Sequence, residues 1–218
     1  MKAAIFDLDG TLIDSMWLWE GLADNYLLSI GIKPPKDLGE SLKVLTLKEA
    51  CFYIKERFRL KDTPDEINQD MEKLLADYYS NRLQLKLYVL EILEEFKSRN
   101  IKMAIATATD EHLVSMVLNR YGIKDYFEFI QTVENIGLSK EQPEFFKTAI
   151  NRLKLDPKDI WVFEDALHCI ISAKKCNLNV VAVKDKSTLP DLDEIKKAAD
   201  IYIDDFSQLE VDKLWKNY

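Results

Sequence analysis

Five short apolar runs alternate with helical patterns along most of the chain, and this alternation constrains the fold more than any other feature. Most of the runs lack polar alternation, which is typical of strands in a parallel sheet that is covered on both faces. The runs are Ala3–Phe6, Met103–Ala106, Ile160–Phe163, Val180–Val183 and Ile201–Ile203. The helical patterns are Val89–Arg99, Glu111–Tyr121, Phe145–Leu153, Leu167–Lys175 and Asp191–Ala198. This order predicts an α/β fold with a doubly wound, Rossmann-like parallel sheet.

One long interval after the first apolar run contains no good strand and interrupts the alternation. Its helical patterns are Ser15–Ile30, Leu45–Phe58 and a segment from Thr63 to about Gln84. Thr63 can cap the third of these helices, because Glu66 stands where a capping box requires an acidic side chain. We therefore predict an inserted, all-helical cap domain. The predicted boundaries are residues 1–14 and 85–218 for the core domain and residues 15–84 for the cap domain.

The composition excludes several classes of protein. Hydrophobic residues make up 47% of the 218 residues, which is enough for a proper core, and the net charge of −8 argues against nucleic acid as a partner. No apolar stretch is long enough to predict a membrane span, and no signal peptide is recognisable at the N-terminus. Three sparse cysteines predict buried, reduced thiols in a cytoplasmic protein, which we expect to be a monomer.

Polar and acidic residues follow each predicted strand, at the sheet edge where open α/β folds bind their ligands. Asp7 and Asp9 follow the first run, and side chains two residues apart in an extended segment point the same way. Two such carboxylates repel each other and favour a cation between them, and Mg²⁺ prefers oxygen ligands of this kind. One aspartate could attack phosphorus while the other moves a proton. Gly10 permits the sharp turn between these residues and the next segment.

Other strand ends supply further candidates. Thr107 carries a hydroxyl, and free backbone N–H groups beginning with Ala108 can cradle phosphate oxygens where a helix opens. Lys140 lies in a loop before a helix, where its charge can offset that of a phosphate. Glu164 and Asp165 offer further acidic oxygens to a cation.

Each of these features alone also has a purely structural interpretation. Asp9 with the next two residues could be only a turn and helix start. Thr107 or Thr109 could simply cap a helix, Lys140 could be a surface lysine, and an acidic pair such as Glu164 and Asp165 suits a helix N-terminus. The order of the features along the chain, with a helical insert after the first strand, favours the catalytic interpretation.

That order resembles the haloacid dehalogenase superfamily of phosphotransferases. In particular it is similar to the branch with a helical cap after the first strand, which includes small-molecule phosphatases and β-phosphoglucomutase. The resemblance covers essentially the whole chain. The motifs that carry it are Phe6–Leu12, Ala106–Thr109, Lys140 with Pro143, and Val162–Ala166.

The resemblance implies a role for each matching residue. Asp7 would be the nucleophile and a magnesium ligand. Asp9 would be the general acid and base, with its backbone carbonyl also touching the metal. Thr107, Ala108 and Lys140 would bind the phosphoryl group. Asp165 would ligate Mg²⁺, with Glu164 beside it as a weaker candidate.

The same resemblance leaves hydrolysis and isomerisation to be distinguished. The sugar-phosphate mutases of this branch carry a histidine where this chain has Trp19, which cannot hold back the acid/base aspartate by charge or proton transfer. We therefore expect a Mg²⁺-dependent phosphatase that hydrolyses a small phosphorylated metabolite, such as a sugar phosphate, through an aspartyl-phosphate. The alternatives are a β-phosphoglucomutase-type isomerase, a non-catalytic phosphate-sensing domain and a phospho-acceptor signalling domain. Lys43 and Lys48 are candidate cap contacts for a second polar group of the substrate.

Overall fold

The computed structural model describes residues 1–42, 45 and 47–215, and the chain forms two compact units. One unit, the α/β core, contains Met1–Met16 and Leu83–Tyr218, and the other, the helical unit, contains Trp17–Arg82. The boundaries predicted after residues 14 and 84 stay a prediction. No helix among the described residues is long and apolar enough to span a bilayer.

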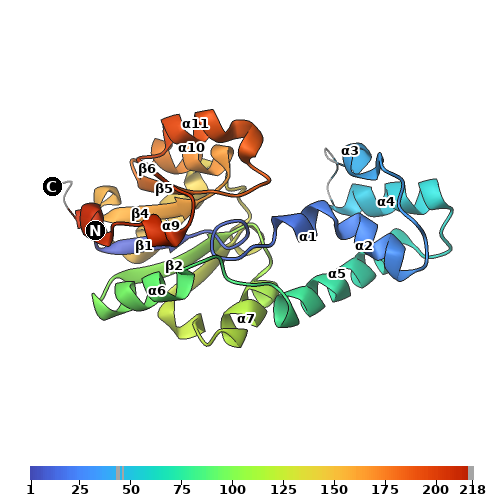
Figure 1. Ribbon diagram of the computed structural model, residues 1–218, viewed down its shortest axis with the longest axis horizontal. Coiled ribbons are helices and arrows are strands. Elements are labelled where there is room, and N and C mark those ends of the chain that lie inside the picture. The colour runs from blue at the N-terminus through green and yellow to red at the C-terminus, as the bar shows by residue number, and fades with distance from the viewer. Residues whose placement is uncertain (43–44, 46, 216–218) are drawn as a thin grey trace. The chain divides into compact units, whose positions relative to one another are not determined.

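The core is built on six parallel strands in the order β3-β2-β1-β4-β5-β6, which confirms the predicted doubly wound α/β sheet (Figure 1). The strands are β1 (Ala3–Phe6), β2 (Lys102–Thr107), β3 (Phe129–Thr132), β4 (Ile160–Glu164), β5 (Asn179–Val183) and β6 (Ile201–Ile203). β1 lies between β2 and β4, with Phe6 in register with Ile105 and Phe163. Residues that follow these three strands are therefore brought to one edge of the sheet.

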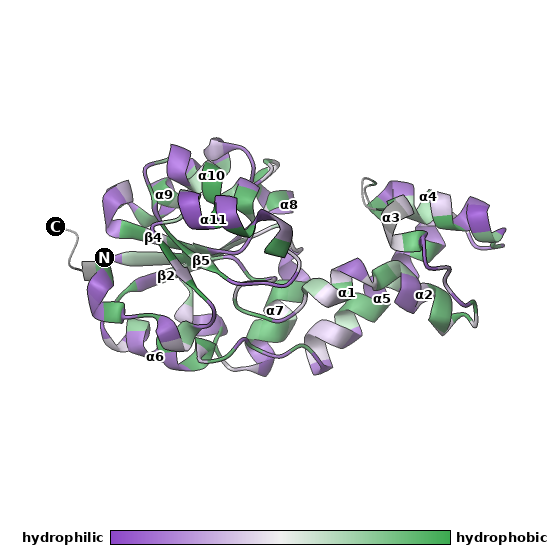
Figure 2. Cartoon of the chain, turned by 45° about the horizontal axis from the view of Figure 1, so that its top comes forward, coloured by the Kyte–Doolittle hydropathy of each residue, from purple (hydrophilic) through white to green (hydrophobic). Residues whose placement is uncertain are grey.

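Helices cover both faces of the sheet, and they carry both hydrophilic and hydrophobic residues (Figure 2). Figure 1 shows α6 and α7 on one side and α10 and α11 on the other. The core helices are α6 (Val89–Ser98), α7 (Glu111–Arg120), α8 (Val133–Ile136), α9 (Pro143–Leu153), α10 (Leu167–Lys175) and α11 (Leu192–Ala198). Side chains alternate along β1, so Ala3 and Ile5 join a hydrophobic cluster with α9 and α10, while Phe6 stacks on Phe163 with 4.6 Å between the ring centroids. Both faces of this central strand are fully buried, as its apolar run predicted.

The helical unit contains α1 (Met16–Glu20) without its first residue, α2 (Leu22–Ser29), α3 (Leu38–Leu42), α4 (Leu47–Phe58) and α5 (Pro64–Asn81). The single helix predicted over Ser15–Ile30 is wrong, because it is interrupted at Gly21, a residue with low helix propensity. α3 was not predicted. The capping box at the start of α5 is confirmed: the Glu66 N–H donates to Thr63 Oγ1 at 3.2 Å, and the Thr63 N–H donates to Glu66 Oε2 at 2.7 Å.

Two core segments that flank the helical unit in the sequence pair with each other. The Asp14 N–H donates to the Gln84 carbonyl at 3.0 Å, and the Lys86 N–H donates to the Leu12 carbonyl at 2.9 Å. Lys86 also forms a largely buried ion pair with Asp185, with 2.9 Å between Nζ and Oδ2. This pair fixes the returning segment to the end of β5.

Candidate active site

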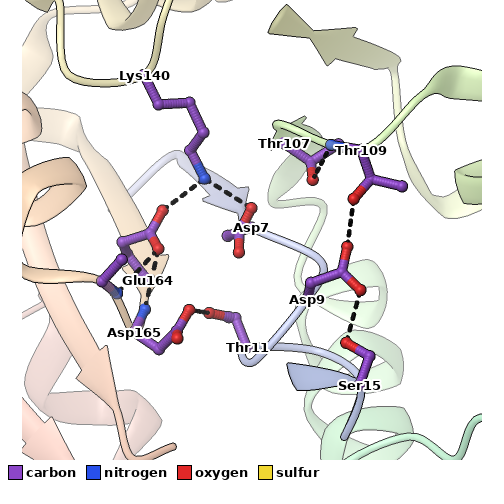
Figure 3. Close-up of polar contacts among 10 residues, drawn as sticks. Asp7, Asp9, Thr11, Ser15, Thr107, Thr109, Lys140, Glu164 and Asp165 are labelled. Atoms are coloured by element: carbon purple, nitrogen blue, oxygen red, sulfur yellow. Dashed lines mark hydrogen bonds and ion pairs between the residues drawn. The ribbon is translucent and has the colours of Figure 1, made fainter. Parts of the chain in front are cut away.

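The end of β1 turns sharply and places two buried aspartates at the edge of the sheet. The Asp7 N–H donates to the Phe163 carbonyl at 2.9 Å, which continues the β1–β4 pairing by one residue. The chain then turns through Gly10, whose φ of +77° lies in the left-handed region that favours glycine. Asp7 and Asp9 are both buried, and Figure 3 shows that their carboxylates have separate partners. The local turn therefore gives the two aspartates different surroundings, although they stand only two residues apart.

Lys140 and Glu164 form a buried ionic network with Asp7. Lys140 Nζ donates to Asp7 Oδ1 at 2.6 Å and to Glu164 Oε2 at 2.7 Å (Figure 3). The other oxygen of Glu164 accepts the backbone N–H groups of Asp165 and Ala166, each at 3.1 Å. Both oxygens of Glu164 are thus engaged, so this residue anchors Lys140. Among the described residues, none donates to Oδ2 of Asp7, which leaves that atom available to a ligand.

Asp165 completes an acidic group on the same side of the site. The nearest carboxylate oxygens of Asp7, Glu164 and Asp165 all lie within 4.8 Å of one another, and all three residues are buried. The Thr11 hydroxyl donates to Asp165 Oδ1 at 3.2 Å. A Cβ atom on Gly10 would lie only 2.5 Å from Asp165 Oδ2. The turn and the acidic group are therefore fitted closely to each other.

Asp9 is held by two hydroxyl groups. Ser15 Oγ donates to Asp9 Oδ1 at 2.6 Å, and Thr109 Oγ1 donates to Asp9 Oδ2 at 2.5 Å (Figure 3). The Asp9 carboxylate is not part of the acidic group formed by the three other carboxylates. Its predicted contact with a metal, through its backbone carbonyl, stays a prediction. Its predicted role in proton transfer stays a prediction as well.

Burial and like charges shift the ionisation of the acidic group. Burial, followed by the neighbouring Glu164 charge, raises the pKa of Asp7 to about 7, against the opposing effect of Lys140. Burial and the Glu164 charge also raise the pKa of Asp165 well above its usual range. Burial disfavours the charge on Lys140, but the carboxylates of Asp7 and Glu164 outweigh this effect and raise its pKa. The group holds more negative charge than Lys140 alone offsets.

A divalent cation fits this arrangement of residues. Asp7 and Asp165 supply hard carboxylate oxygens, which are the ligands that Mg²⁺ prefers. The absence of a side chain at Gly10 lets the Asp165 carboxylate lie against the turn without a clash. A cation there would relieve the repulsion that raises both pKa values. Asp7 and Asp165 would hold the ion, and Glu164 would stay bound to Lys140.

The end of β2 supplies the candidate phosphate contacts. The Thr109 N–H donates to Thr107 Oγ1 at 3.2 Å, so the Thr107 hydroxyl retains its own proton for a ligand. Ala108 is exposed, and α7 begins at Glu111. Asp110 stands at the N-cap of this helix without a side-chain cap bond. Neither threonine caps the helix, and the Thr109 hydroxyl binds Asp9 instead.

Sequence reasoning did not assign the partners of Asp9. Ser15 and Thr109 are ordinary hydroxyl residues, and the Thr109 contact joins residues 100 positions apart. The proximity of β2 to β1 was the only available signal for it. The buried ion pair of Lys86 with Asp185 was not predicted either, because a lysine beside the end of an insert is typically solvated.

Replacement of Gly10 by alanine should reduce activity much more than it reduces stability. The left-handed φ costs a non-glycine residue about 1–2 kcal/mol, and the new methyl group displaces Asp165. Misplacement of a site residue by about 1 Å lowers turnover roughly 10²-fold, measurable as phosphate release. Gly122→Ala is the matched control, because Gly122 has φ +67° but nothing within 4 Å of a Cβ. Equal activity losses in the two variants would exclude the clash with Asp165.

Comparison with known families identifies the group to which the chain belongs. Residues 4–183 match the family model of haloacid dehalogenase-like hydrolases. The chain is a haloacid dehalogenase-like hydrolase. The resemblance predicted from the strand-end motifs is thereby confirmed, and so is the assignment of the chain as an enzyme of this class.

Individual relatives agree with this assignment. The chain is 27% identical over 178 residues to a phosphorylated carbohydrates phosphatase of Thermotoga maritima, which covers 82% of each chain. It is 23% identical over 187 residues to hexitol phosphatase B of Escherichia coli, covering 83% of this chain and 82% of the relative. A solved Thermotoga maritima structure with a provisional β-phosphoglucomutase name is 26% identical, with a TM-score of 0.82 and coverage of 93% and 94%.

Proposed function

We propose that this enzyme is a Mg²⁺-dependent phosphatase that hydrolyses a small phosphorylated metabolite, such as a sugar phosphate. The observation that carries the proposal is the buried group of Asp7, Lys140 and Asp165, next to an Asp9 carboxylate with separate partners. The names of the two phosphatase relatives support a phosphorylated carbohydrate or polyol as the substrate class.

The first chemical step forms an aspartyl-phosphate on Asp7. An oxygen of Asp7 attacks phosphorus, the bond from phosphorus to the alcohol oxygen breaks, and Asp9 gives a proton to that oxygen. Lys140, the Thr107 hydroxyl and the Ala108 N–H would hold the phosphoryl oxygens. Bound Mg²⁺ would supply positive charge to the phosphoryl oxygens and to the carboxylates of the site.

The second step releases phosphate. Asp9 takes a proton from a water molecule, whose oxygen attacks phosphorus and breaks its bond to Asp7. Ser15 and Thr109 hold the Asp9 carboxylate at a defined place for both proton transfers. Most of the rate enhancement would come from positioning and electrostatics, as in other phosphoryl transfers.

A sugar-phosphate isomerase is the second candidate, because the chain resembles a structure with a β-phosphoglucomutase name. Trp19 favours hydrolysis instead. Its indole N–H donates to the Tyr79 hydroxyl at 3.0 Å within the helical unit, and an indole cannot exchange protons with an aspartate. Phosphate release without isomerised product would support the first candidate.

Removal of divalent metal should abolish turnover. We expect a panel of phosphate esters to release inorganic phosphate with Mg²⁺ present, and no measurable phosphate after treatment with EDTA, because Lys140 alone does not offset the acidic group. Activity should return when Mg²⁺ is added back in excess, which controls for damage by the chelator. Full turnover in EDTA would contradict the metal requirement, and isomerised product without phosphate would contradict hydrolysis.

A further inference from the structure

The helical unit contains a cavity of about 650 Å³ that is formed by its own residues alone. This volume lies within the range of small-molecule binding sites, roughly 300–1,000 Å³. Helices α1 to α5 all contribute to it, and Figure 1 shows these helices together. Most of its wall is apolar. The apolar residues that line it include Leu22, Leu42, Leu47, Ala50 and Met71.

Two acidic residues, one exposed and one half-buried, also line the cavity. Glu20 ends α1, and Asp24 lies one turn further along the chain in the first turn of α2. Among the described residues, neither carboxylate has a hydrogen-bond or ion-pair partner, and no lysine or arginine lines the cavity. Lys43 lies outside the described residues, and Lys48 is exposed on α4. The described wall therefore carries two acidic side chains and is otherwise largely apolar.

Trp19, which precedes Glu20 in the sequence, adds an aromatic surface to the wall of the cavity. Its N–H is already satisfied by the Tyr79 hydroxyl, and the two rings pack edge to face at 6.5 Å. The indole is thus fixed in place, and what it offers a ligand is its electron-rich ring. Indole is the strongest aromatic partner for an organic cation.

We propose that this cavity binds a small organic cation, a primary ammonium group carried on an apolar carbon skeleton. The apolar wall removes the skeleton from water, and the carboxylates of Glu20 and Asp24 accept the ammonium N–H groups. An anion would meet the two carboxylates of Glu20 and Asp24, and a neutral polyol would place its hydroxyls against leucine and methionine. The inference concerns the helical unit only and does not depend on the phosphatase chemistry proposed for the core.

Binding of a matched pair of probes to the full-length chain tests the proposal. The 4-phenylbutylammonium ion and its uncharged isostere, 4-phenylbutanol, differ in the ammonium group but share the apolar skeleton. By calorimetry, we expect the ammonium ion to bind at least about 10-fold more tightly, which corresponds to about 1.4 kcal/mol. Equal affinities, or no binding of either probe, would overturn the proposal.

Charge-neutral variants locate the binding. The double variant Glu20→Gln/Asp24→Asn should lose the preference for the ammonium ion but still bind the alcohol. Glu56→Gln/Asp62→Asn is the matched control, because it removes the same charge at exposed positions of the same unit. An equal loss of the ammonium preference in both double variants would show that it depends only on net charge. That result would overturn the assignment of Glu20 and Asp24 to the binding site. The methyl resonances of Ala23 and Ala50, which both line the cavity, report occupancy in the unmodified chain, so the test survives a variant that does not fold.

Inhibition of hydrolysis distinguishes two sources of the cation. Competitive inhibition of turnover of a generic phosphate ester by 4-phenylbutylammonium would mean that the ammonium group belongs to the substrate. Binding without inhibition would mean a separate ligand, and both results support the cavity assignment. Because binding is measured directly, failure of this proposal is distinguishable from failure of the phosphatase proposal. A chain that binds the ammonium ion but releases no phosphate would overturn only the latter.

Discussion

Asp7→Asn should lower phosphate release by at least about 10⁴-fold while the chain remains folded. The variant keeps the size of the side chain but removes the attacking oxygen, and loss of a nucleophile costs effects of this order. Lys140 retains Glu164 as a partner at 2.7 Å, so the network is weakened but not dismantled. Initial rates with a generic phosphate ester and Mg²⁺ measure the loss. Asp193→Asn, at an exposed position of α11, should leave the rate unchanged.

The same variant should also change how the stability of the metal-free chain depends on pH. Folding raises the pKa of Asp7 from its ordinary value of 3.8 to about 7, so the folded state binds more protons than the unfolded state between these pH values. The free energy of unfolding in EDTA should therefore fall as the pH rises through this window. Asp7→Asn should flatten this fall, and Asp165, whose pKa is also raised, should retain part of it. Denaturant titrations from pH 4 to pH 8 measure how steeply the free energy of unfolding falls. Separately, unchanged turnover in Asp7→Asn would exclude Asp7 as the nucleophile.

Strand positions were predictable where the sheet is buried on both faces. β1, β4 and β5 read as continuous apolar runs because helices cover both of their faces, and each was located from this pattern alone. β3 was missed because it does not show this continuous apolar pattern. It lies at the edge of the sheet, its first two residues are only half buried, and Gln131 takes an interior position by donating to the Phe145 carbonyl at 2.8 Å. A polar residue that finds a backbone acceptor breaks the apolar pattern without breaking the strand.

The positions of most candidate site residues were predictable because these residues directly follow predicted strands. Parallel strands end at one edge, so Asp7, Thr107 and Asp165 had to approach one another once the strand order placed β1 between β2 and β4. The assignment of partners was not predictable. Lys140 lies 133 residues from Asp7, and no local pattern shows that it contacts Glu164 as well. Which oxygen is engaged and which is available depends on side-chain packing that the sequence does not encode locally.

Lys140→Met should destabilise the metal-free chain and abolish most activity. Removing one partner of a buried ionic network leaves uncompensated charge and typically costs about 3–5 kcal/mol. The Lys140 side chain is only 7% exposed, and those of its partners Asp7 and Glu164 are 8% and 2% exposed. Loss of a charge that stabilises the transition state should lower turnover roughly 10²–10³-fold. Chemical denaturation in EDTA and phosphate release with Mg²⁺ measure the two effects.

A second substitution separates the structural part of this effect from the catalytic part. In Lys140→Met/Glu164→Gln one of the two unpaired carboxylates becomes neutral, and the glutamine carbonyl can still accept the backbone N–H groups of residues 165 and 166. Much of the lost stability should return, but activity should not, because nothing replaces the charge beside Asp7. Lys147→Met on α9, which breaks an exposed pair with Glu144, should cost less than about 1 kcal/mol. If activity recovered together with stability, Lys140 would only support the fold, and its proposed contact with the phosphoryl group would be wrong.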